Sequence, residues 1–70
     1  MDWTSCDVVE SNSDIMSGTP VIVDTRIPVS AIFENIEGGA SIQDIVSWFT
    51  GITEDQIREV LRFTAKSAAA

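Results

Sequence analysis

Three basic side chains near the end of the sequence have the clearest chemical spacing: Arg58, Arg62 and Lys66 stand four residues apart. Residues four apart lie on one face of a helix, so this face could contact successive phosphates of DNA, as a recognition helix does. The same pattern is typical of a solvated helix face, because Glu54 precedes Arg58 by four residues, the order that favours an intrahelical ion pair. The solvated face is the favoured interpretation, and the DNA-contacting face stays open.

Two polar side chains at the start of the same segment, Thr53 and Gln56, could hydrogen-bond to base edges in a groove of DNA. They also have the spacing of a capping box, in which each side chain accepts a hydrogen bond from the other residue's backbone N–H, and this role is favoured. Glu54 and Asp55 lie in the first turn, where a helix-turn-helix reaches the bases, and they would repel phosphates. The candidate DNA-binding residues are Thr53, Gln56, Arg58, Arg62 and Lys66.

The sequence contains no recognisable catalytic or metal-binding set. It has no histidine and no tyrosine, and its single cysteine, Cys6, has no obvious base to activate it. The carboxylates are scattered, and no Gly-rich phosphate loop or HExxH motif is present. A zinc site would need carboxylates and one thiol, which is an improbable ligand set. The chain is therefore not expected to be an enzyme, and no metal, cofactor or small-molecule substrate is expected.

Size and composition point to one small domain that associates with another macromolecule. A chain of 70 residues buries only about 60% of the surface that its unfolded form exposes. One cysteine allows no intrachain disulfide, yet 44% of the residues are hydrophobic, so a homodimer is expected to bury part of the apolar surface. The net charge of −7 counts against a protein that binds nucleic acid on its own.

The expected location is the cytoplasm. A lone Cys6 fits a reducing compartment. The start, Met1-Asp2-Trp3, has an acid and lacks the basic and apolar regions of a signal peptide. The longest apolar runs are too short to span a bilayer, so no membrane partner is expected.

The fold class predicted from the pattern is α+β: a short N-terminal β-hairpin followed by a three-helix bundle with a helix-turn-helix, in a winged-helix-like arrangement. Turn residues Ser17–Pro20 precede the β-branched run Val21–Val23, which predicts a hairpin of roughly residues 6–10 and 20–24. The single domain over 1–70 divides into an irregular or short-strand part (1–13), a hairpin and strand region (14–27), the bundle (28–67) and a frayed end (68–70).

Each helix has a start and a stop signal. Pro28 fits the first turn of the first helix, and Gly38-Gly39 ends it. Ser41, with Asp44 in the first turn, starts the second, which ends at Thr50-Gly51. The third helix begins at Thr53, where Ile52 and Ile57 have the positions of a hydrophobic staple, and is predicted to run to about Lys66.

Five apolar side chains are candidates for a partner interface. Trp48 and Phe63 lie at the margins of the apolar stripes of their helices, where they either contact a partner or widen the core. Trp3, in the irregular start, is either disordered or docked on a partner. Val21 and Val23 lie on a strand that either pairs with a second copy or packs on the helices, because two isolated strands are marginal in water.

Most of the chain, about residues 15–67, resembles the small bacterial proteins grouped as domain-of-unknown-function family 433. Thr-Arg-Ile-Pro-Val is the most specific part of the resemblance. The matching segments are Gly18 to Ile22, Thr25 to Val29, Ile32 to Gly39, Ser41 to Ile45, and Ile52 to Ile57. The sequence departs from the family pattern at Asp24, where a glycine commonly precedes Thr-Arg, and at Thr50-Gly51, which replaces a more usual Pro-x turn.

The resemblance implies a winged helix-turn-helix-like antitoxin encoded beside a toxin with a PIN-like nuclease fold. Such an antitoxin would dimerise, neutralise the toxin and repress its own operon by binding operator DNA. The alternative is a protein-interaction adaptor of the same fold that binds no nucleic acid, which the net charge favours.

Overall fold

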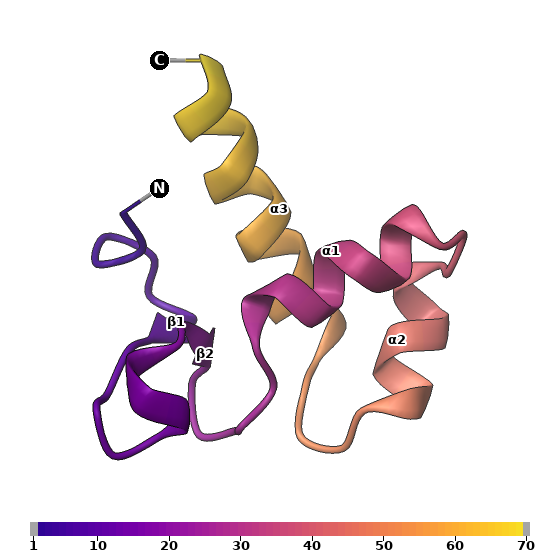
Figure 1. Cartoon of the computed structure of the whole chain (residues 1–70). Coiled ribbons are helices and arrows are strands. Elements are labelled where there is room, and N and C mark those ends of the chain that lie inside the picture. The colour runs from indigo at the N-terminus through magenta and orange to yellow at the C-terminus, as the bar shows by residue number, and fades with distance from the viewer. Residues whose placement is uncertain (1, 70) are drawn as a thin grey trace.

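The computed structural model of the chain describes residues 2–69 and has a two-stranded hairpin followed by three helices (Figure 1). This order confirms the predicted α+β fold. The elements are β1 (Val9–Glu10), the 3₁₀ turn η1 (Met16–Gly18), β2 (Val21–Ile22), α1 (Val29–Glu37), α2 (Ile42–Trp48) and α3 (Glu54–Ala69).

The hairpin is shorter than the pattern predicted. Its strands are antiparallel, with Val9 opposite Ile22 and Glu10 opposite Val21. One further hydrogen bond, from Val23 N–H to Val8 O at 3.0 Å, continues the pairing. The chain then turns at Asp24, whose φ of 61° is incompatible with an extended strand.

Helix α1 starts and stops at the predicted signals. Pro28 is the N-cap residue, one position before the helix, so its missing N–H costs no helical hydrogen bond. Val29 and Ile32 are buried on the inner face. After Glu37 the chain passes through Gly39, whose φ of 100° is the left-handed conformation that favours glycine at helix ends.

Both later helices begin with the predicted caps. Ser41 Oγ accepts from the N–H of Asp44 at 3.0 Å, and the Asp44 carboxylate accepts from the N–H of Ser41 at 3.0 Å. Between α2 and α3 the chain turns through Gly51, which has a φ of 93°. The helix-turn-helix is therefore two separate helices, as the sequence predicted. Helix α3 extends to Ala69, three residues past the predicted end at Lys66.

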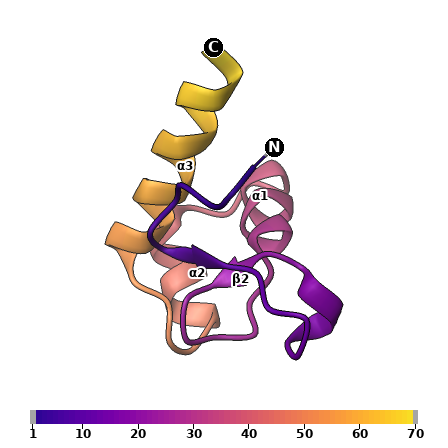
Figure 2. The same ribbon diagram turned by 90° about the vertical axis from the view of Figure 1, so that its left-hand side faces the viewer.

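Residues 68 and 69, predicted to fray, thus continue α3, while residue 70 lies outside the described residues. The last turns of α3 extend beyond the rest of the fold in both views (Figures 1 and 2). Their side chains from Ala65 to Ala69 are exposed. This end is the longest continuously exposed stretch of α3.

The core lies between the hairpin and the three helices. Val21 has no exposed surface, so this candidate interface residue belongs to the core: the hairpin packs on the chain's own helices. Val23 is half-buried. The buried hydrophobic residues are Cys6, Val9, Val21, Ile22, Val29, Ile32, Ile45, Ile52, Ile57 and Val60. Within residues 2–69 no helix has both the length and the apolar character needed to cross a membrane.

Candidate functional site

Helix α3 carries the predicted basic face. Arg58, Arg62 and Lys66 are all exposed and follow one another along the helix at intervals of four residues. The electrostatic character of this face depends on which carboxylates lie next to the three bases, because a base that is already paired attracts a phosphate less strongly.

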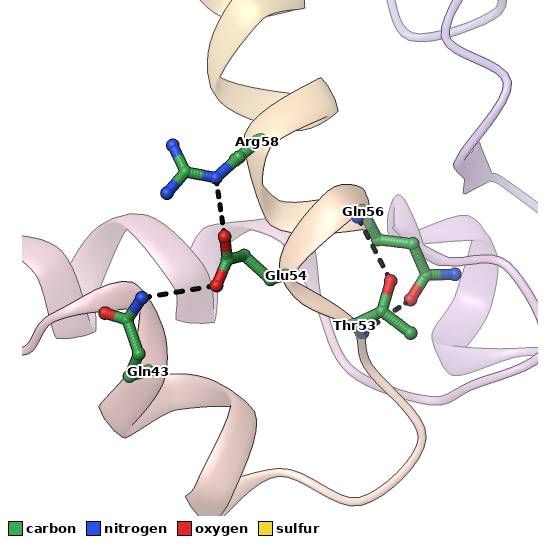
Figure 3. A network of polar contacts seen from close by, with 5 residues as sticks. All are labelled: Gln43, Thr53, Glu54, Gln56 and Arg58. Atoms are coloured by element: carbon green, nitrogen blue, oxygen red, sulfur yellow. Dashed lines mark hydrogen bonds and ion pairs between the residues drawn. The ribbon is translucent and has the colours of Figure 1, made fainter.

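Arg58 is paired within its own helix. Its Nε lies 2.9 Å from Glu54 Oε2, and the other oxygen of Glu54 accepts from Gln43 Nε2 of α2 at 3.2 Å (Figure 3). The side chains of Arg58 and Glu54 are 50% and 45% exposed, so water screens the pair. The intrahelical pair predicted from the spacing is confirmed, and it extends to the preceding helix through a glutamine.

Arg62 is paired with a carboxylate that the sequence analysis did not single out. Its Nη2 lies 3.0 Å from Glu59 Oε1, and its Nε lies 3.3 Å from the same oxygen. The three-residue spacing of Glu59 and Arg62 was the available signal. Lys66 has no ion pair among residues 2–69. Two of the three bases on this face are therefore offset by neighbouring acids.

Thr53 and Gln56 form the capping box. Thr53 N–H donates to Gln56 Oε1 at 2.9 Å, and Gln56 N–H donates to Thr53 Oγ1 at 3.2 Å (Figure 3). The favoured capping role is confirmed. Both accepting oxygens are engaged at the start of α3, beside the exposed acids Glu54 and Asp55, so the N-terminal turn presents negative charge to any approaching phosphate.

Trp3 lies against the last helix of its own chain. Its ring centroid is 5.0 Å from that of Phe63, and the ring planes are inclined by 32°. Both side chains are half-buried and pack on the edge of the core. The preceding residue is also held: Asp2 accepts two hydrogen bonds from Thr4, which lower the pKa of Asp2. Trp3 and Phe63 therefore cover part of each other, which corrects the expectation that Trp3 is either disordered or docked on a partner.

Trp48 is different, since 62% of its surface is exposed at the end of α2. It lines a pocket of about 350 Å³ together with Glu34, Asp44 and the glycines that end α1. Trp48 was a predicted interface residue, whereas the acids around it were not predicted to form a site. The sequence could have indicated the acidic surroundings of Trp48, because no base stands between Arg26 and Arg58.

In the described part of the chain, no three His, Cys, Asp or Glu side chains come together as a group that could hold a metal ion. Cys6, the single cysteine, is a buried free thiol.

Comparison with known proteins gives a family and one curated relative. The model of the family described as "Protein of unknown function (DUF433)" matches residues 9–64. "Uncharacterized protein y4eO" of Sinorhizobium fredii (strain NBRC 101917 / NGR234) is 31% identical over 52 residues, 74% of this chain and 24% of that protein. The chain thus spans about a quarter of the relative's length. No solved structure matches, so the winged-helix-like arrangement stays a prediction.

The family match begins at β1, includes all of α1 and α2, and ends in the second half of α3. It contains both capping boxes and the turn at Gly51. The chain therefore belongs to the DUF433 family of proteins of unknown function.

Proposed function

We propose that this protein is an antitoxin-like regulator that binds a partner protein directly, and that the partner is a nuclease toxin with a PIN-like fold. The observation that carries the protein-binding part is the pairing of Arg58 with Glu54 and of Arg62 with Glu59. These pairs leave the helix that would enter a DNA groove with little free positive charge. The nuclease part rests on the family resemblance and on charge.

A nuclease must hold the phosphates of its substrate, which requires a basic surface. A chain with a net charge of −7 is complementary to such a surface. An acidic protein that covers the basic groove of the nuclease excludes the nucleic acid, and the toxin is thereby inhibited. Electrostatic complementarity of this kind also speeds association.

The test is to co-express the chain with the small nuclease-like protein encoded beside its gene. We expect the two to co-purify, and RNA cleavage by the nuclease to fall to background at an equimolar ratio. A complex whose partner has no nuclease activity would instead favour the adaptor. Undiminished cleavage at a severalfold excess of this chain would contradict the proposal.

DNA binding through α3 is the second candidate, and it is favoured by the exposed Lys66, which follows Arg62 by four residues and has no ion pair within residues 2–69. An electrophoretic shift with the upstream DNA at two salt concentrations tests it, with and without the toxin. If DNA binds, Arg62→Ala should weaken it for all sequences and reduce the salt slope by about one unit. Absence of any salt-sensitive shift would remove DNA from the function.

A homodimer is part of the same proposal. Its support is the hydrophobic share of 44%. The hairpin no longer supports it, because β2 is buried against the chain's own helices. Light scattering at micromolar concentration should give twice the mass of one chain, and the mass of a single chain would contradict the dimer.

A further inference from the structure

The Trp48 pocket combines an exposed aromatic ring with carboxylates. Trp48 is the most exposed large hydrophobic side chain among residues 2–69, at 62%. The pocket beside it has a volume of about 350 Å³, and Glu34 and Asp44 both line it. Its lining residues are Glu34, Asn35, Gly38, Gly39, Ala40, Asp44 and Trp48.

The charged side chains that line this pocket are both acidic. It lies at the C-terminal end of α1, where the helix dipole is negative and where a lysine or arginine is normally favourable. Helix α1 has Glu34 and Glu37 in its last turn instead, and no base there. Residues 27–57 contain five acids and no base, and none of the residues that line the pocket is basic.

The end of α1 therefore has a negative field next to an aromatic face. A cation held over an indole ring is attracted by the ring's negative face, and tryptophan is the strongest aromatic partner. Arginine fits this combination better than lysine, because its planar guanidinium stacks on the ring while its fork of N–H groups donates to a carboxylate.

We propose that the Trp48 pocket docks an arginine side chain from a basic segment of a partner protein, with the guanidinium on the indole of Trp48 and paired with Glu34. This inference rests on the proposed function and adds where the partner binds. Residues of the α1–α2 connection line the pocket. In Figure 1 this connection lies on the opposite side of the fold from the hairpin and away from the protruding end of α3. A partner held there leaves that end of α3, with Lys66, uncovered.

The experiment uses the full chain and hexa-arginine peptide as the probe, with affinities measured by titration calorimetry. We expect Trp48→Ala and Glu34→Gln each to weaken binding by about three- to tenfold. The matched control is Asp7→Asn, which removes the same charge from an exposed position outside the pocket and should change the affinity by less than about twofold. Circular dichroism checks that each variant folds.

If Glu34→Gln and Asp7→Asn lose the same affinity for hexa-arginine, the peptide is attracted by net charge alone. That result would overturn the proposal that arginine docks in the Trp48 pocket. Hexa-lysine should bind at least about threefold more weakly than hexa-arginine, and equal affinities would overturn the choice of arginine. In a Trp3→Phe background, Trp48 is the single tryptophan, since the sequence has two. Its fluorescence should change on titration with hexa-arginine, and an unchanged spectrum would overturn the stacking.

The pocket and the proposed function fail in different ways. If Trp48→Ala binds and inhibits the nuclease as tightly as the unaltered chain, the partner does not dock at the Trp48 pocket, and the antitoxin function stands. If the unaltered chain binds no nuclease while the peptide results hold, the nuclease is not the partner, and the arginine-binding pocket stands.

Discussion

Arg58 and Glu54 form an ion pair across one turn of α3, with 2.9 Å between Nε and Oε2, and Gln43 of α2 donates to the second oxygen of Glu54. The carboxylate thus joins the two helices of the helix-turn-helix and also offsets the first base of the α3 face. The same carboxylate that links α2 to α3 lowers the attraction of this face for phosphates.

Replacing Glu54 by glutamine removes the negative charge and should uncover Arg58. We expect a loss of stability below about 1 kcal/mol, because the pair is half-exposed. Retention on a heparin column should increase more than in Asp55→Asn, which removes the same charge from the same helical turn without freeing a base. Equal retention of the two variants would mean that Glu54 does not mask Arg58.

The capping box at Thr53 should be worth a measurable share of the stability. Thr53→Ala removes the oxygen that accepts from Gln56 N–H, so the free energy of unfolding should fall by about 1 kcal/mol. Thr53→Ser keeps that oxygen and should lose less than half as much. Urea denaturation gives both values, and an exposed neighbour outside the helices, Thr50→Ala, serves as the control. A cost no larger than that of Thr50→Ala would contradict the role of the cap.

Local signals explain why so much of the helical part could be predicted. A cap needs residues only three positions apart, and the predicted N-cap at Ser41 and the predicted capping box at Thr53 are both formed. The end of α3 was missed for a related reason. After Lys66 the sequence is Ser-Ala-Ala-Ala, which has no glycine or proline to stop a helix and is rich in the residue with the highest helix propensity.

Features that depend on distant parts of the chain were harder to predict. Val21 lies in the apolar run Val21–Val23, which alone does not show whether the strand faces a second copy or the chain's own helices, and the structure shows that Val21 is buried. The contact of Trp3 with Phe63 joins two ends of the sequence, and no local pattern encodes it. The Trp48 pocket requires α1 and α2 to be placed side by side before Glu34 and Trp48 line the same hollow.

Trp3 and Phe63 should be coupled in stability. Aromatic pairs at such distances contribute about 0.5–1.5 kcal/mol beyond the burial of their area. A double-mutant cycle with Trp3→Ala, Phe63→Ala and the double variant should give a coupling energy in that range. The same cycle with Trp48→Ala in place of Trp3→Ala should give a coupling near zero. A Trp3–Phe63 coupling that is also near zero would mean that the N-terminal segment does not stabilise α3.

Asp24 has a φ of 61°, and its N–H donates to Glu10 Oε2 at 2.7 Å across the hairpin. The left-handed conformation costs a residue with a Cβ about 1–2 kcal/mol relative to glycine, which explains why glycine suits this place before Thr-Arg. Glycine also gives the unfolded chain more freedom, which offsets part of that gain. We therefore expect Asp24→Gly to be more stable than Asp24→Ala by about 1 kcal/mol in urea denaturation.

The matched pair at Asp7 gives the opposite expectation. Asp7 is exposed and is not among the residues with positive φ, so Asp7→Ala should be at least as stable as Asp7→Gly. If alanine is also the better residue at position 24, the turn after β2 does not require a left-handed residue in solution. The test is therefore which variant, alanine or glycine, is more stable at position 24 and which is more stable at position 7. Opposite orders at the two positions would support a left-handed backbone at Asp24 that ends the hairpin before the Thr-Arg-Ile-Pro segment.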